Sequence, residues 1–254
     1  MPFLTNCVAC VYFFVLLRVR RKTTFVCINP EKFSLQKYIV LGVCAVGIPA
    51  AIQNLLNVTG MTILNNFTSS YGAQAVAAMG ITQKINMVPL QVAMGFSQGI
   101  MPLISYNYAS GNHRRMKETI FFTIKTLLPF LVVVSLGYFA GAGLLTRAFM
   151  DNEAIVAYGT RFLRGFCLGL PFLCMDFLAV GVFQAVGMGK AALSFAILRK
   201  IVLEIPALYL LNLLFPLYGL SYAQLVAELV LSIASVIMLA RIFRRMQRED
   251  GASS

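Results

Sequence analysis

The stretch that decides the fold is Gly165-Phe-Cys-Leu-Gly-Leu-Pro-Phe-Leu-Cys-Met-Asp-Phe-Leu-Ala-Val-Gly-Val-Phe-Gln-Ala-Val-Gly187, in which Asp176 is the only charged residue. The nearest charged residues in sequence, Arg164 and Lys190, are each more than three helical turns away. An apolar run of this length can cross a bilayer. A carboxylate at the bilayer centre costs about 2.5–3.5 kcal/mol on insertion scales. The stretch therefore predicts a transmembrane helix, and Asp176 predicts an ion or substrate site within it.

Composition extends this interpretation to the whole chain of 254 residues. Hydrophobic residues make up 59% of it and charged residues only 12%, about half the usual share of roughly 25% in soluble domains. Mean hydropathy is +0.80. The formal net charge is +12, but the basic residues fall in short loops between apolar runs, which indicates membrane topology rather than a nucleic-acid partner. These values predict a multi-pass membrane protein.

Motifs of enzymes and of metal sites are missing from the sequence. It contains neither G-x-S-x-G nor H-E-x-x-H, and the single histidine, His113, has no second histidine to share a metal. The turn Gly187-Met-Gly-Lys190 differs from a P-loop because Ala191 stands where Ser or Thr would bind magnesium. Most of the six cysteines lie inside apolar runs and are expected to pack as small hydrophobes. We expect no enzymatic activity, no cofactor and no bound metal.

Seven apolar segments predict an all-α integral membrane fold with seven transmembrane helices: 3–17, 38–66, 74–106, 119–146, 154–186, 191–214 and 219–243. Basic residues gather after the first, third, fifth and seventh segments: Arg18, Arg20, Arg21, Lys22, Lys32 and Lys37; Arg114, Arg115 and Lys117; Lys190, Arg199 and Lys200; Arg241, Arg244, Arg245 and Arg248. By the positive-inside rule, this alternation predicts a cytoplasmic C-terminus and an N-terminus outside the cell membrane.

Several polar side chains fall at membrane depth. Gln53 and Asn57 are four residues apart and share a helix face, which fits either interhelical hydrogen bonds or a substrate-facing role. Lys84 lies about ten residues into its segment, where it must snorkel, pair or line water. Glu204 follows Lys200 by four residues, which predicts an ion pair within one helix near the cytoplasmic face.

Two further features are predicted to hold helices together. Glu228 lies within the last apolar segment, where we expect it to bond a neighbouring helix. Three small-xxx-small patterns are expected to let helix backbones approach closely: Gly95-Phe-Ser-Gln-Gly99, Gly137-Tyr-Phe-Ala-Gly141 and Gly165-Phe-Cys-Leu-Gly169.

Six short stretches between about residue 38 and residue 245 form a recognisable set: Gly47-Ile-Pro49, Tyr71-Gly-Ala-Gln-Ala-Val-Ala-Ala-Met-Gly80, Gly95-Phe-Ser-Gln-Gly-Ile-Met-Pro102, Tyr106-Asn-Tyr-Ala-Ser-Gly-Asn112, Cys174-Met-Asp176 and Gln184-Ala-Val-Gly-Met-Gly189. With these stretches, the sequence from about residue 38 to 245 resembles the C-terminal half of a MATE (multidrug and toxic compound extrusion) exporter. The resemblance implies twelve helices in two six-helix lobes related by a pseudo-two-fold axis. It implies that residues 1–37 form the last helix of the N-terminal lobe and a cytoplasmic linker. Residues 38–245 would form the C-terminal six-helix lobe, and residues 246–254 a cytoplasmic tail.

The resemblance also implies an activity, the efflux of small cationic, amphipathic drugs by antiport with H⁺ or Na⁺. Asp176 matches the carboxylate that helps to bind the coupling cation in sodium-coupled members. Asn57-Val-Thr59 stands where those members tend to carry Glu-Val-Thr, so a Na⁺ site at Asp176 and proton coupling are both open. Gln53, Asn57, Lys84 and Gln184 are our candidates for the substrate-binding lining.

Five of the family's twelve helices have no counterpart here, so we expect the chain to work with an N-terminal lobe or a second copy, as a fragment, a split gene product or a dimer. Two alternatives remain. One is a lipid-linked oligosaccharide flippase of the same superfamily, for which Lys84 and Arg164 would matter more than Asp176. The other is a non-transporting membrane scaffold or receptor.

Overall fold

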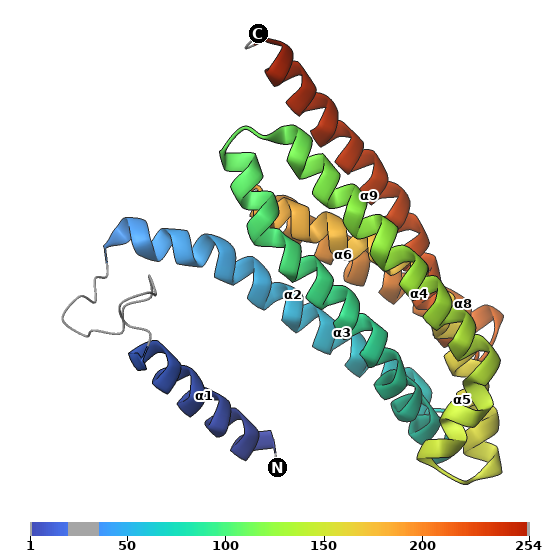
Figure 1. The fold of residues 1–254 in the computed structure, drawn as a ribbon. Coiled ribbons are helices and arrows are strands. Elements are labelled where there is room, and N and C mark those ends of the chain that lie inside the picture. Colours follow the sequence, from blue (N-terminus) through green and yellow to red (C-terminus); the bar gives the residue numbers. More distant parts are fainter. Residues whose placement is uncertain (1, 20–35, 253–254) are drawn as a thin grey trace. The chain divides into compact units, whose positions relative to one another are not determined.

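The computed structural model describes the backbone of residues 2–19 and 36–252, and every element in these ranges is a helix (Figure 1). Residues Met1–Ala45 and Val46–Ser254 form two compact units. The first unit holds α1 (Pro2–Val19) and the start of α2 (Lys37–Ser69). The predicted linker up to residue 37 lies largely outside the described residues. The all-α prediction is confirmed.

The second unit continues with α3 (Ala73–Ala109), α4 (His113–Phe149), α5 (Glu153–Cys167) and α6 (Leu170–Ala185). It ends with α7 (Gly189–Ile197), the π-helical segment η2 (Leu198–Glu204), α8 (Ile205–Leu214) and α9 (Gly219–Ala252). Because α9 runs on through Ala252, the predicted polar tail is helical over its described part. One helix therefore runs from Gly219 to Ala252, and it continues past the end of the predicted apolar segment 219–243.

Among the described helices, α2, α3, α4 and residues Gly219–Arg244 of α9 are long and apolar enough to span a membrane. The pair of α5 and α6, bent by 48° at the break between them, meets the same criterion only when the two are taken together. The prediction of a membrane-embedded protein is thus confirmed. Two predicted spans differ from this pattern. The segment 3–17 corresponds to the shorter helix α1, and the segment 191–214 is divided among α7, η2 and α8. The predicted count of seven spans therefore stays a prediction.

Turn chemistry explains where α4 and α7 begin. Gly111 and Gly187 have φ angles of 71° and 77°, a left-handed conformation that glycine adopts without steric cost at a helix C-terminus. After Gly111, the Asn112 side chain accepts a hydrogen bond from the Arg115 backbone N–H and caps α4. These residues let the apolar helices reverse within a few residues.

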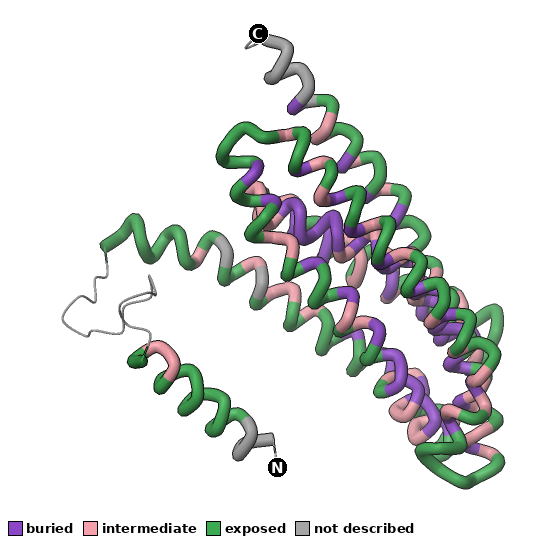
Figure 2. Tube along the Cα trace, viewed as in Figure 1, coloured by how far each residue is buried: buried purple, intermediate pink, exposed green. Residues whose placement is uncertain are grey.

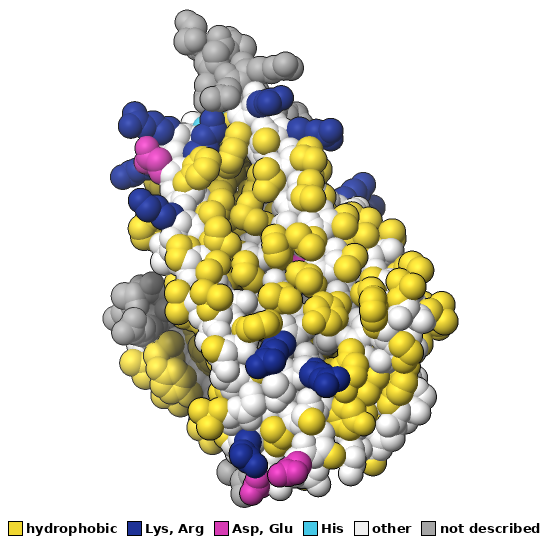
Figure 3. Space-filling model, turned by 90° about the vertical axis from the view of Figure 1, so that its right-hand side faces the viewer, with side chains coloured by type: hydrophobic (Ala, Val, Ile, Leu, Met, Phe, Trp, Pro, Cys, Tyr) yellow, Lys and Arg dark blue, Asp and Glu magenta, His cyan; other side chains and the backbone are white. Residues whose placement is uncertain are grey.

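The second unit is a bundle in which α3 packs against α4, α5 and α6, and α9 packs against α5, α6, η2 and α8. Burial is concentrated on α6 and on the facing sides of its neighbours (Figure 2). The main core cluster joins residues of α6 to residues of α3, α4, α7 and α9: Leu178, Val182 and Phe183 with Ile104, Met116, Ile120, Phe195 and Leu231. The outer faces are apolar as well. Hydrophobic side chains cover most of the face in Figure 3, and many Lys and Arg side chains gather at one end, as expected of a surface that meets lipid.

Only one of the three predicted glycine motifs lies at a helix contact. A Cβ atom on Gly165 would lie 2.2 Å from the Ser221 Oγ of α9, and one on Gly169 would lie 3.6 Å from the Leu225 Cα. At Gly95, Gly99, Gly137 and Gly141 no described atom lies within 4 Å of such a Cβ. These glycines lie on faces of α3 and α4 that no other helix of the described chain covers, so for those two motifs close packing stays a prediction.

Candidate functional site

The residue that first indicated a site, Asp176, lies in the middle of α6 and is 2% exposed. Its carboxylate is paired, although the sequence offers no nearby partner. The Arg199 guanidinium reaches it from η2, with 3.1 Å between Nη1 and Asp176 Oδ2. By sequence, Arg199 is grouped with the basic residues of short loops, and the structure corrects this: Arg199 lies in η2 and its side chain is only 12% exposed.

Arg199 also contacts a second carboxylate. Its Nη2 donates to Oε1 of Glu228, a fully buried residue of α9. The guanidinium carbon Cζ lies over the Phe177 ring, 5.5 Å from its centroid, a cation–π geometry. The predicted bond between Glu228 and a neighbouring helix is thereby confirmed. One side chain ties η2 to α6 and to α9.

The predicted pair of Lys200 and Glu204 is confirmed, with 2.7 Å between Lys200 Nζ and Glu204 Oε1. Both side chains are largely buried, so Lys200 does not belong to a solvated loop either. The pair faces Gly60 of α2, where an added Cβ would lie 3.1 Å from Lys200 Nζ. The absence of a side chain at Gly60 makes room for the lysine.

The local geometry of η2 explains how two adjacent basic residues reach different helices. In this segment the Ile205 N–H bonds the carbonyl of Lys200, five residues earlier, which widens the turn relative to an α-helix. Pro206 follows and has no N–H to continue the α-helical ladder. Arg199 meets α6 and α9, whereas Lys200 lies beside α2. Such π-helical turns occur frequently at functional sites.

We call Asp176, Arg199, Lys200, Glu204 and Glu228 the charge cluster. Three carboxylates face two basic groups, so the formal charge of the ionised cluster is −1. Not every buried atom in it has a partner, because Glu228 Oε2, Glu204 Oε2 and Arg199 Nε make no hydrogen bond. Burying charge is costly unless it is compensated, so this cluster favours one additional positive charge.

A small polar cavity adjoins the charge cluster. Its lining residues come from α2, α6, α7 and η2: Gln53, Asn57, Asp176, Val180, Ala196, Arg199 and Lys200. Its volume is about 10 Å³, close to the smallest space that holds one water molecule. Carboxylate and amide oxygens are ligands that hard cations prefer. The arrangement therefore suits a single small cation.

Of the five sequence-predicted site residues, the cavity brings together Asp176, Asn57 and Gln53. The other two lie apart from it. Gln184 is eight residues beyond Asp176 on α6, about 12 Å along the helix axis, and is half-buried. Lys84 is exposed on α3. No three His, Cys, Asp or Glu side chains converge on a metal-binding geometry in the described part of the chain.

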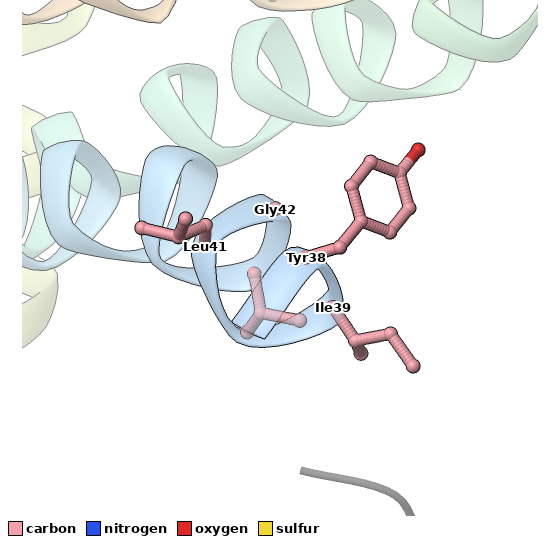
Figure 4. A pocket seen from close by; sticks show the side chains of 5 residues that line it. Tyr38, Ile39, Leu41 and Gly42 are labelled. Carbon is pink, nitrogen blue, oxygen red and sulfur yellow. The ribbon is translucent and has the colours of Figure 1, made fainter. Parts of the chain in front are cut away.

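A second hollow lies at the start of α2 and is lined by Tyr38, Ile39, Leu41, Gly42 and Val43. Figure 4 shows that these residues belong to one stretch of a single helix and that the Tyr38 and Ile39 side chains point away from it. No charged residue lines this hollow, which has the character of an apolar, lipid-facing surface.

A membrane-embedded helical bundle with an ionisable cluster beside a polar cavity is typical of transport proteins. Comparison with known proteins agrees. The MatE family model matches residues 49–210, and the chain belongs to this family. It is 32% identical over 237 residues to the multidrug export protein MepA of Staphylococcus saprophyticus, covering 93% of this chain and 51% of that protein. The chain thus spans about half the length of the curated relatives it matches.

Solved structures confirm the fold. An outward-facing multidrug resistance MATE family transporter of the MOP superfamily aligns with a TM-score of 0.85 at 18% identity, over 95% of this chain and 55% of that one. A MOP superfamily transporter from Pyrococcus furiosus, described as having a binding pocket of reverse polarity that suggests a different function, aligns with a TM-score of 0.84 at 18% identity, over 94% of this chain and 54% of that one.

Proposed function

We propose that this chain forms one lobe of a secondary transporter that exports cationic, amphipathic compounds in exchange for H⁺ or Na⁺, with Asp176 as the cation-coupling residue. The observation that carries the proposal is the placement of Asp176. It is buried in the charge cluster and borders a cavity that Gln53 and Asn57 also line. The matched MepA relative is a multidrug export protein, which supports the substrate class.

The charge cluster supplies a physical basis for coupling. The cluster has one negative charge in excess. Binding of one cation at Asp176 makes the cluster neutral, and release of that cation restores the net charge of −1. A carboxylate at this depth interacts strongly with a cation because little water screens the pair. When the cation binds on one side of the membrane and leaves on the other, as in alternating access around a midplane site, its electrochemical gradient can drive drug movement in the opposite direction.

The remaining parts of the proposal concern the whole transporter. Gln53, Asn57, Lys84 and Gln184 would line the substrate path, with Lys84 and Gln184 in a wider cavity that a second lobe completes. That lobe would be an N-terminal lobe or a second copy of this chain. The protein would lie in the cell membrane with its C-terminus in the cytoplasm, as the basic residues predict.

The test is cation-driven ethidium efflux from proteoliposomes that hold the chain together with the N-terminal half of the S. saprophyticus relative. We expect Asp176→Asn to lower the efflux rate at least tenfold under both a proton and a sodium gradient. The neutral amide can neither take up and release a proton nor compensate the charge of a sodium ion. Asp151→Asn is the matched control, since that carboxylate is 86% exposed. Equal efflux in wild type and Asp176→Asn would refute the proposed role.

One observation favours the flippase alternative. Arg164 lies in the last turn of α5, where its Nε donates to the Phe139 carbonyl at 3.2 Å and its guanidinium lies 5.2 Å from the Phe139 ring centroid. Lys84 and Arg164 are both exposed and could meet a lipid phosphate. Growth complementation of a flippase-deficient strain by wild type, and its loss in Lys84→Gln/Arg164→Gln, would establish this function in place of drug export.

A further inference from the structure

The guanidinium of Arg199 already occupies the position that a coupling cation would take beside Asp176. Arg199 Nη1 lies 3.1 Å from Asp176 Oδ2, and both side chains border the small cavity. A cavity of about 10 Å³ leaves no room for a hydrated ion beside the guanidinium. A cation that binds Asp176 must therefore weaken or replace the contact with Arg199.

Glu228 provides the second half of such an exchange. It already accepts a hydrogen bond from Arg199 Nη2, and its other oxygen, Oε2, has no partner. The unbonded Nε of Arg199 is also available. A guanidinium and a carboxylate can form two parallel hydrogen bonds. When Arg199 leaves Asp176, it can therefore satisfy its nitrogens on Glu228 without being exposed to lipid.

Charge balance favours the same two states. With Arg199 between Asp176 and Glu228, one guanidinium serves two carboxylates and the trio has a formal charge of −1. With a cation on Asp176, the trio becomes two neutral pairs, one of Asp176 with the cation and one of Glu228 with Arg199. The neighbouring pair of Lys200 and Glu204 is neutral in both states.

From this geometry we propose that Arg199 is a tethered competitor of the coupling cation for Asp176, and that Glu228 retains Arg199 while the cation is bound. The inference rests on the proposed role of Asp176. It makes Arg199 and Glu228 positioning residues that set how tightly the cation binds and when it leaves.

The exchange also changes a mechanical link. The contact between Asp176 and Arg199 joins α6 to η2, whereas the contact between Glu228 and Arg199 joins α9 to η2. Cation binding would release the first link and keep the second. The wide π-helical turn, followed by Pro206, is a place where the helix can bend at low cost. Cation occupancy would thus loosen α6 from η2.

The test measures Na⁺ binding to the full chain in detergent micelles, as the Na⁺-dependent rise of the unfolding temperature at constant ionic strength, with N-methylglucamine replacing Na⁺. Removing the charge of Arg199 alone would also make the net charge of the trio more negative by one. The decisive variant is therefore Arg199→Gln/Glu228→Gln, which removes one charge of each sign. The quantity compared is the apparent Na⁺ dissociation constant, fitted to the rise of the unfolding temperature with Na⁺ concentration. We expect this constant to be at least tenfold lower in the double variant than in wild type.

A second variant of unchanged charge is Arg199→Lys. An ammonium group lacks the fork that bridges two carboxylates, so we expect an apparent Na⁺ dissociation constant at least threefold lower than in wild type. Lys190→Gln, on the exposed start of α7, is the control and should leave this dissociation constant unchanged. Dissociation constants within twofold of wild type in both Arg199 variants would overturn the proposal.

Adding Asp176→Asn to the double variant should abolish the Na⁺ response. If the response persists, the cation does not bind at Asp176, and the inference is wrong. The proposed function is judged separately, by efflux. If Asp176→Asn loses efflux while the Arg199 variants bind Na⁺ like wild type, the transporter role stands and only the tethered competitor is refuted.

Discussion

Arg199 compensates two buried carboxylates from two different helices, and this makes it the side chain whose loss should cost the bundle most. In Arg199→Met the volume is nearly kept, but Asp176 and Glu228 lose their common counter-charge. Removing one partner of a buried ion pair costs about 3–5 kcal/mol. We therefore expect the free energy of unfolding, measured by SDS titration in mixed micelles, to fall by about that amount.

The exposed residue Arg241 on α9 offers the matched control, and Arg241→Met should change stability by less than about 0.5 kcal/mol. Replacing the trio by apolar residues, Asp176→Leu/Arg199→Met/Glu228→Leu, should restore most of the lost stability, because no buried charge is then left unpaired. A cluster that contributes only packing would behave otherwise, with Arg199→Met as stable as wild type.

At the scale of single residues, sequence reasoning reached part of the candidate site. Asp176, Asn57 and Gln53 are polar residues in apolar runs, and the structure places all three on one cavity. Arg199 was missed because, by sequence, it is grouped with Lys190 and Lys200 as a basic run that follows the fifth segment. The missed signal is that Arg199 and Lys200 lie inside the apolar segment 191–214, where basic side chains must pair.

At the scale of elements, the contact between α5 and α9 depends on the absence of a side chain at Gly165. An added Cβ would lie 2.2 Å from Ser221 Oγ and 2.7 Å from Ser221 Cβ. Overpacking of this kind typically costs about 1–3 kcal/mol. We expect Gly165→Ala to lower the free energy of unfolding by about that amount in the same SDS titration.

Gly137→Ala on α4 is the comparison, since no described atom lies within 4 Å of its added Cβ. There alanine should be neutral or stabilise by up to about 1 kcal/mol, through its better helix propensity. Equal effects at Gly165 and Gly137 would show that α5 and α9 do not approach as closely as the structure has them.

Element boundaries followed from hydropathy where a helix is continuous and failed where it is not. The predicted segment 154–186 is two helices, α5 and α6, bent by 48°, and Pro171 stands in the first turn of α6. Proline interrupts the backbone hydrogen bonds of a helix, so Pro171 is the sequence mark of this break. The π-helical turn at Leu198–Glu204 has no such mark in the sequence, and the contacts that Arg199 makes from it join residues far apart along the chain.

At the scale of the whole molecule, the exposed polar residues of α2 support the proposal that a second lobe completes the cavity. Gln53 is half-buried, and Asn54 and Asn57 are exposed, on a helix that is otherwise apolar enough to span the membrane. Polar groups that face lipid without a partner are unfavourable. The chain also spans about half the length of its curated relatives. A second lobe would cover these side chains and complete the substrate path.

We therefore expect proteoliposomes with this chain alone to show ethidium efflux no faster than those with Asp176→Asn, and addition of the N-terminal half of the S. saprophyticus relative to raise the rate at least tenfold. Because Asn57 borders the cavity, Asn57→Leu should lower the restored rate severalfold, while Asn66→Leu, an exposed position one turn from the end of α2, should not. Efflux from the chain alone that rises with the square of its concentration in the membrane would contradict the need for an N-terminal lobe and assign the second lobe to another copy of this chain.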